Sequence, residues 1–217
     1  MKALNEYIDH TLLKANAKTA DIVQLCHEAI EYKFYSVCVN SAFVPVCNKE
    51  LAGTDVKIAC VVGFPLGAMA TEAKVFETDY ACRNGASEID MVMAVGLMKE
   101  GNTAAVYSDI KSVCDCAAKY GALVKVILET CELTDSEIAE ACHIAEKAGA
   151  AFVKTSTGFG SGGATEHHVE LMRKSVSSNI SVKASGGIRD RETALRMIEA
   201  GADRIGASAG IAICKDS

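Results

Sequence analysis

Three charged side chains stand in segments that are mostly apolar, and their types indicate a particular chemistry. They are Asp90 within residues 88–92, Lys154 within residues 151–155 and Lys183 within residues 180–184. A charge is costly to bury in such a segment unless it is paired or its pKa is shifted. A buried lysine that gives up its proton becomes a nucleophile, because the neutral amine attacks carbonyl groups to form an imine.

Two interpretations of these side chains are open. Asp90 and Lys154 could form a structural ion pair that ties two strands together, since structural pairs also perturb pKa values. Lys183 favours a reactive site, because two lysines that converge on one carboxylate leave a positive charge unmatched. This cationic neighbour and partial burial both favour the neutral amine of Lys154. Lys125 is a weaker candidate of the same kind, and a stem packed under a helix is its alternative.

Two glycine-rich stretches indicate an anion site. Residues 185–190 (Ser-Gly-Gly-Ile-Arg-Asp) and 206–210 (Gly-Ala-Ser-Ala-Gly) each follow an expected strand and open an expected helix. Glycines let backbone N–H groups approach a phosphate closely, and a helix N-terminus favours negative charge. A Gly-Gly pair alone would be a turn, but two such loops at these places predict phosphate binding. A third stretch, residues 157–163, is either a mobile loop over the site that supplies further N–H donors from Gly158 or a flexible connection.

The cysteines and histidines do not have the spacing of a metal site. Cys114 and Cys116 point to different faces of an expected helix, and no CxxC pair occurs. Most cysteines lie in apolar periodic segments, where a reduced cysteine is a small core residue, so a reducing cytoplasm is expected. His167 and His168 are expected to be solvated, and His10 either lines the site or has a structural role. No metal and no cofactor are predicted.

A loose internal repeat positions these residues. Four times, a helical segment ends in Gly-Ala and an apolar strand follows: Gly85-Ala86, Gly121-Ala122, Gly149-Ala150 and Gly201-Ala202. Glycine just past a helix end supplies the left-handed conformation that stops the helix. Counting five residues on from each glycine gives Asp90, Val126, Lys154 and Gly206. The repeat therefore places Asp90 and Lys154 at comparable heights on two strands and gives Lys125 the opposite parity.

Eight expected strands, separated by about the length of one βαβ unit, complete the pattern. They centre near Ile8, Val37, Ala59, Ile89, Lys125, Val153, Val182 and Ile205, with helical stripes between them. Thr134 and Glu137 form a predicted capping box, and Asp190 is a predicted N-cap. This alternation predicts an α/β fold, a single-domain (β/α)8 barrel over residues 1–217. The rival fold, a doubly wound sheet, would carry a glycine-rich fingerprint after its first strand, and residues 9–13 have none.

The composition and net charge of the chain limit the classes of partner that it can bind. The chain has 217 residues and a formal net charge of −6, which argues against a nucleic-acid surface because that needs clustered Lys and Arg. A compact anionic substrate remains compatible, since a local site can be positive on an acidic protein. No signal peptide is expected at residues 1–6, which lack an apolar stretch, and no run has the length of a membrane span.

Four segments together resemble the deoxyribose-phosphate aldolase family. They are Asp-His-Thr-Leu-Leu at 9–13, Glu-Ile-Asp-Met-Val at 88–92, Phe-Val-Lys-Thr-Ser-Thr-Gly-Phe at 152–159 and Val-Lys-Ala-Ser-Gly-Gly-Ile-Arg at 182–189. The resemblance runs from about Asp9 to Gly210, and the last two blocks together are highly specific. It implies a metal-independent class I aldolase that reversibly cleaves 2-deoxy-D-ribose 5-phosphate to D-glyceraldehyde 3-phosphate and acetaldehyde, in the breakdown of deoxyribose phosphates.

The resemblance also implies roles for individual residues. Lys154 would form the imine, Lys183 would lower its pKa, and Asp90 would handle protons through water. The implied phosphate contacts are Gly158, Gly186, Gly187, Gly206 and Ser208, and Thr11 and Cys38 would lie near the sugar. Some family members end in a tyrosine that assists proton transfer. Because this chain ends in Cys214-Lys215-Asp216-Ser217, that assistance is expected to be absent or to come from elsewhere. A homodimer is expected.

Two other functions fit the same residues. A phosphosugar isomerase or epimerase on the same barrel would use Asp90 as a base and Lys154 as an electrostatic clamp. A catalytically inactive barrel would bind a sugar phosphate as a sensor. Because a fold alone does not assign chemistry, the interpretation as an imine-forming aldolase depends on the residue set.

Overall fold

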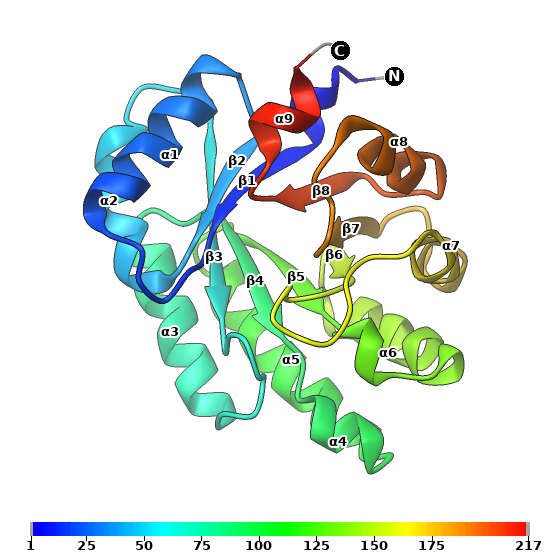
Figure 1. Cartoon of the computed structure of the whole chain (residues 1–217). Coiled ribbons are helices and arrows are strands. Elements are labelled where there is room, and N and C mark those ends of the chain that lie inside the picture. The colour runs from blue at the N-terminus through cyan, green and yellow to red at the C-terminus, as the bar shows by residue number, and fades with distance from the viewer. Residues whose placement is uncertain (1, 216–217) are drawn as a thin grey trace.

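The chain forms a closed barrel of parallel strands that follow one another in sequence order, with β8 pairing against β1 (Figure 1). The computed structural model describes residues 2–215. The strands are β1 Ile8–Leu12, β2 Ser36–Val39, β3 Lys57–Val62, β4 Glu88–Val92, β5 Leu123–Ile127, β6 Phe152–Lys154, β7 Ser181–Ser185 and β8 Arg204–Ala207. Each expected strand centre lies within its observed strand.

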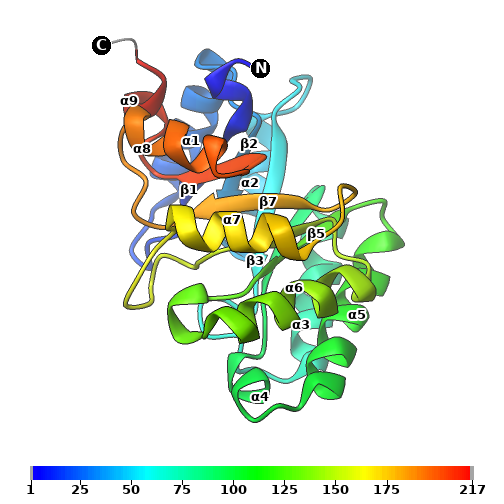
Figure 2. The same ribbon diagram turned by 90° about the vertical axis from the view of Figure 1, so that its right-hand side faces the viewer.

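Helices pack around the outside of the barrel (Figure 1, Figure 2). They are α1 Thr19–Glu31, α2 Val44–Glu50, α3 Thr71–Arg83, α4 Val95–Lys99, α5 Thr103–Ala118, α6 Asp135–Ala148, α7 Glu166–Ser175, α8 Arg191–Glu199 and α9 Gly210–Cys214, with short 3-10 turns at Leu4–Tyr7, Ser41–Phe43 and Thr130–Glu132. The predicted single-domain (β/α)8 barrel is confirmed. Its predicted bounds of 1–217 stay a prediction, because Met1, Asp216 and Ser217 lie outside the described residues.

Local sequence signals explain where the helices start and stop. Thr134 and Glu137 form the predicted capping box of α6, and the Asp190 side chain accepts from the Thr193 N–H as the N-cap of α8. The four glycines of the Gly-Ala repeat have positive φ, from 67° to 113°, which a residue without Cβ adopts at little cost. The helices then bury their apolar stripes against the outer face of the barrel.

The turn between Gly121 and its strand is one residue shorter than the corresponding turn after Gly85. Strand β4 begins three residues after Gly85, whereas β5 begins two residues after Gly121. Lys125 is therefore the third residue of its strand, like Asp90 and Lys154, and its Cα pairs with that of Asp90. The predicted opposite parity of Lys125 is wrong, and so is its alternative as a stem under a helix: Lys125 points into the barrel and is fully buried.

The alternation of side chains along the strands separates two environments. In β4, Ile89 and Met91 belong to the large apolar core between barrel and helices, while Glu88 and Asp90 point inward. The inside of the barrel therefore carries charged side chains, whereas the side chains on its outer face are apolar. Charged groups buried in this way have strongly perturbed pKa values. Within residues 2–215, no helix combines the length and the apolar character needed to cross a bilayer.

Candidate active site

The Asp90 carboxylate is the meeting point of three lysines. Its Oδ2 accepts from Lys154 Nζ at 2.8 Å and from Lys183 Nζ at 2.7 Å, and its Oδ1 accepts from Lys125 Nζ at 2.7 Å. The strand register explains this convergence, because the Cα of Lys154 pairs with that of Lys183 and the Cα of Asp90 with that of Lys125. The three predicted catalytic residues are therefore brought together, with Lys125 as a fourth member.

A second layer of charges lies behind this cluster. Asp9 accepts from the Lys183 amine and, at 2.7 Å, from the Arg204 guanidinium. Glu88 lies 2.5 Å from Lys125 Nζ and 3.2 Å from Arg204. Asp9, Glu88 and Arg204 are therefore functional candidates that were not predicted from the sequence.

The charges of this interior do not balance. Three carboxylates face four cationic side chains: Asp9, Glu88 and Asp90 against Lys125, Lys154, Lys183 and Arg204. Burying an unmatched charge costs free energy, so the state of lowest free energy is the one in which one cation gives up its proton. Lys154 is the lysine of this group that lines the open pocket, whereas Lys125 and Lys183 are fully buried.

The pKa directions agree with this count. Burial lowers the pKa of Lys154; Asp90 opposes that effect and the positive charge of Lys183 adds to it. Burial also opposes the charge of Lys183, but Asp9 and Asp90 raise its pKa above the usual value. Burial alone would raise the pKa of Asp90, yet the three lysines hold it well below its ordinary value. The site therefore holds Lys154 toward the neutral amine while Lys183 stays an ammonium and Asp90 a carboxylate.

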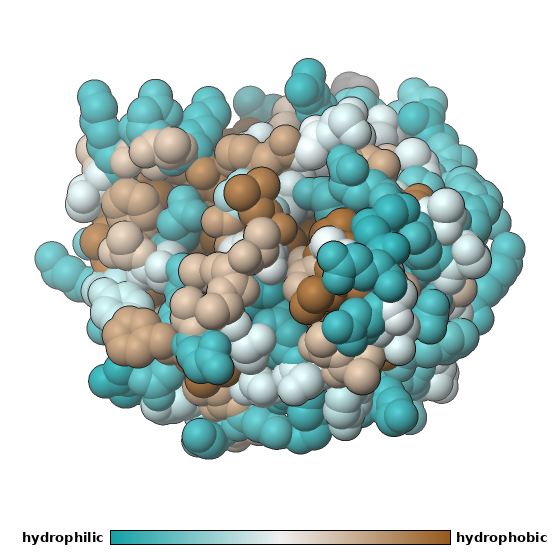
Figure 3. Space-filling view, turned by 90° about the horizontal axis from the view of Figure 1, so that it is seen from below, coloured by the Kyte–Doolittle hydropathy of each residue, from teal (hydrophilic) through white to brown (hydrophobic). Residues whose placement is uncertain are grey.

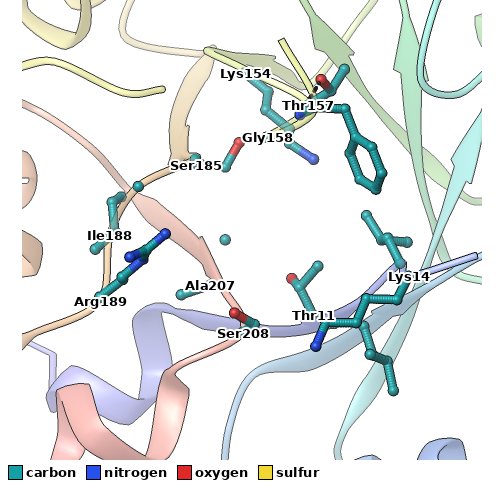
Figure 4. Close-up of a pocket in the computed structure, with 16 residues that line it drawn as sticks. Thr11, Lys14, Lys154, Thr157, Gly158, Ser185, Ile188, Arg189, Ala207 and Ser208 are labelled. Carbon is teal, nitrogen blue, oxygen red and sulfur yellow. Dashed lines mark hydrogen bonds between the residues drawn. The ribbon is translucent and has the colours of Figure 1, made fainter. Parts of the chain in front are cut away.

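A cavity of about 300 Å³ opens above Lys154 at the carboxyl ends of the strands. Figure 4 shows the Lys154 side chain reaching into it from one side, with Thr11 and Ser208 on the opposite side. All but one of the residues predicted to contact the sugar or the phosphate line this cavity: Thr11, Gly158, Gly186, Gly187, Gly206 and Ser208. Asp90 and Lys183 lie beneath it, fully buried. Cys38 is the exception, because it is fully buried, with its Sγ 4.0 Å from Asp90 Oδ2.

The first of the two predicted anion loops adopts a conformation that requires glycine. Gly186 and Gly187 have φ of 87° and 81°, a region that residues with a Cβ rarely enter. Glycine is needed at Gly206, in the second loop, for a steric reason: a Cβ there would lie 2.9 Å from Lys183 Cε. Two cationic side chains without an assigned role, Lys14 and Arg189, also line the cavity (Figure 4). They add the positive charge that an anionic ligand needs.

None of the described histidines and cysteines lines this cavity. His10 pairs with Glu28 at 2.7 Å, so its structural alternative is the observed one. His167 is exposed and lies 2.8 Å from Asp135. In the part of the chain from 2 to 215, no group of three or more His, Cys, Asp or Glu side chains is arranged to hold a metal ion.

The sequence matches a family of aldolases over almost its whole length. A family model described as the DeoC/LacD family aldolase covers residues 4–216. The chain belongs to the DeoC/LacD aldolase family. A deoxyribose-phosphate aldolase from Alkaliphilus oremlandii is 59% identical to it over 211 residues, which are 97% of this chain and 95% of that relative.

Solved structures of similar proteins share this barrel. A candidate deoxyribose-phosphate aldolase from Coccidioides immitis is 44% identical, with a TM-score of 0.95 over 99% of this chain and 86% of the other. The deoxyribose phosphate aldolase from Aeropyrum pernix, described as a unique tetramer, is 33% identical, with a TM-score of 0.92 over 97% of this chain and 89% of the other. The DeoC/LacD assignment therefore rests on both sequence and fold.

Proposed function

We propose that this DeoC/LacD aldolase is a deoxyribose-phosphate aldolase of class I, a lyase, with Lys154 as the imine-forming residue. The observation that carries the proposal is that a single oxygen atom, Asp90 Oδ2, accepts hydrogen bonds from both Lys154 and Lys183. Two ammonium groups on one buried carboxylate oxygen disfavour each other, so the amine that faces the cavity is the one to lose its proton. A neutral amine facing the cavity is the reagent that a carbonyl substrate needs.

The bond changes follow from that amine. Lys154 attacks the C1 aldehyde of open-chain 2-deoxyribose 5-phosphate, and loss of water gives a protonated imine. Removal of the proton from the C3 hydroxyl breaks the C2–C3 bond, releases glyceraldehyde 3-phosphate and leaves its electron pair on the imine as an enamine. Protonation at C2 and hydrolysis then release acetaldehyde and restore the amine. Asp90 as a carboxylate and Lys183 as an ammonium have the states needed to accept and donate these protons through water.

The glycine loops would hold the phosphate of the substrate. Gly158, Gly186, Gly187 and Gly206 present backbone to the cavity, beside Ser208, and Arg189 adds a charge suited to a phosphate. Thr11, across the cavity from Lys154 (Figure 4), would contact the sugar. Cys38 would act from beneath, next to Asp90, without lining the cavity. Fixing one end of the substrate brings its aldehyde into register with the amine.

Gly187→Leu should raise KM for the phosphorylated substrate roughly 10- to 100-fold, as expected for losing a hydrogen bond to a charged group. The kcat should change much less, because Lys154 is untouched. The matched control is Gly121→Leu: its φ is 67° and, as at Gly187, an added Cβ would meet no atom within 4 Å, but it lies in the turn before β5. Both variants should lose similar stability from backbone strain. Equal KM values in the two variants would contradict a phosphate site at Gly187.

The reaction class and the residue are tested together by reductive trapping. Acetaldehyde or the phosphorylated sugar with borohydride should inactivate the protein, and peptide mass spectrometry should find the reduced adduct on Lys154. An isomerase or epimerase would form no adduct there. A sensor would bind the sugar phosphate without releasing acetaldehyde. An adduct on Lys183 or Lys125 instead would refute the assignment of Lys154.

The assembly and the compartment are further parts of the proposal. A homodimer is supported by apolar side chains that remain exposed on the single chain, such as Leu66, Met69, Phe76 and Phe159. Seen from below, apolar residues gather over the left half and centre of the molecule (Figure 3), and patches of this kind often mark interfaces. Ten free cysteines support a reducing compartment such as the cytoplasm.

A further inference from the structure

Glu129 lies two residues after the end of β5 and has an uncommon backbone conformation. Its φ is 57° and its ψ is 62°, the left-handed region. Among residues 2–215, Lys33 and Glu129 are the residues other than glycine with a positive φ. Such a conformation persists where surrounding interactions enforce it, and these positions cluster at functional sites. The Glu129 side chain is also buried, with 7% of the residue exposed.

The Glu129 carboxylate binds Thr157 of the neighbouring loop with both of its oxygens, and Oε1 also accepts from Cys131 Sγ at 3.9 Å. Oε1 accepts from the backbone N–H of Thr157 at 3.1 Å, and Oε2 accepts from the Thr157 hydroxyl. The same hydroxyl oxygen accepts from the Phe159 N–H at 3.0 Å. Two donors of Thr157 therefore meet two carboxylate oxygens, and the hydrogen-bond chain continues over Gly158 to the next residue.

This loop is anchored at its other end as well. The Ala164 N–H donates to the carbonyls of Ser185 and Gly186 at 3.1 and 3.0 Å. A Cβ on Gly163 would lie 2.3 Å from the Gly186 oxygen, so the two loops are in close backbone contact. The segment 157–163 is thus held at one end by Glu129 and at the other by the backbone of Ser185 and Gly186.

Glu129 itself does not reach the substrate cavity. It lines a neighbouring cavity of about 350 Å³ together with Pro65, Leu66 and Val95, while Thr157 and Phe159 line both cavities. The wall between the two cavities is therefore the segment that Glu129 holds, and Gly158 in that wall faces the substrate side.

We propose that Glu129 is a positioning residue for substrate phosphate: from the end of β5 it fixes Thr157 and so sets the place of the Gly158 N–H opposite Gly186. This inference rests on the proposed function, since it takes the substrate to carry a phosphate. It assigns to Glu129 an effect on binding and none on the imine chemistry of Lys154.

Two variants test the assignment. Glu129→Ala removes both acceptors, whereas Glu129→Gln keeps the shape and one acceptor but places an NH₂ group against a hydroxyl that already accepts from Phe159. We expect KM for the phosphorylated substrate and the inhibition constant of inorganic phosphate to rise about tenfold in Glu129→Ala, the equivalent of ~1.4 kcal/mol, and less in Glu129→Gln. The kcat should stay within about threefold, and borohydride trapping of acetaldehyde on Lys154 should be unchanged.

The control is Glu132→Gln, an exposed glutamate of the same loop that makes no hydrogen bond to Thr157 in the described structure; its KM should equal that of the parent. Thr157→Val should raise KM like Glu129→Gln, and the double variant should be no worse than the poorer single one, because both remove the same link. If Glu129→Ala fails to fold, Glu129→Gln and Thr157→Val decide.

The outcomes separate the two claims. Unchanged KM and phosphate inhibition in the Glu129 variants, with or without a lower Tm, would overturn the positioning role. Additive effects of Glu129→Gln and Thr157→Val would also overturn it. Absence of any adduct on Lys154 in the parent protein would instead overturn the proposed function.

Discussion

Lys154→Ala should abolish aldol cleavage while leaving the fold intact. Without the amine no imine forms, so the loss should approach the whole acceleration, which for enzymes is at least ~10⁶-fold. The fold should tolerate the change because Lys154 is the surplus cation of the interior. Its removal leaves Asp9, Glu88 and Asp90 against three cations, a balanced set. Acetaldehyde release should be measured together with Tm, which should lie within a few degrees of the parent value.

Lys154→Arg is the matched companion of that variant. Arginine keeps a positive charge at all accessible pH values and forms no imine, so it should be equally inactive, yet it restores the excess of cations. We therefore expect Lys154→Arg to have the lower Tm of the two. Substantial turnover in Lys154→Ala would exclude the imine mechanism. A Tm of Lys154→Ala far below that of Lys154→Arg would contradict the charge count.

The fold was predictable because it depends on local signals. Glycines past helix ends, capping residues and apolar strands each act over a few residues, and together they placed every strand. The catalytic cluster was predictable for a related reason: Asp90, Lys154 and Lys183 stand out as charges within apolar strands. Burying such a charge costs free energy, so a charged residue within an apolar strand indicates a functional site.

The remaining charges gave no comparable signal. Asp9 is followed by His10 and Thr11, and Glu88 opens its strand, so neither stands out from an apolar background. Their burial depends on strand register, which spans the barrel and is not a local property. Lys125 is an example of this dependence on register. Because the turn after Gly121 is one residue shorter than the turn after Gly85, the Lys125 side chain points in the opposite direction to the one predicted. Likewise, the resemblance placed Cys38 near the sugar but did not give its depth beneath the cavity.

Lys183→Leu should move the acid side of the pH–rate profile to higher pH. The activity falls on the acid side as Lys154 takes up a proton. Removing Lys183 takes away a positive neighbour and leaves Lys154 as the remaining lysine on Asp90 Oδ2, so both changes raise the pKa of Lys154. In the charge count, three carboxylates would then face three cations only if Lys154 is protonated. At neutral pH we expect kcat/KM to fall by ~10²- to 10⁴-fold, the range for losing acid–base assistance.

Lys74→Met is the control that separates this effect from lost stability. Lys74 is also fully buried and pairs with Asp109 at 2.6 Å, but on the outer side of the barrel between α3 and α5. Breaking either buried pair should cost about 3–5 kcal/mol of the free energy of unfolding, while the profile should shift only in Lys183→Leu. Borohydride trapping of acetaldehyde as a function of pH gives the same answer without turnover: the pH at which Lys154 becomes reactive should rise in Lys183→Leu and stay constant in Lys74→Met. A constant value in both variants would mean that burial alone, without Lys183, sets the pKa of the reactive amine.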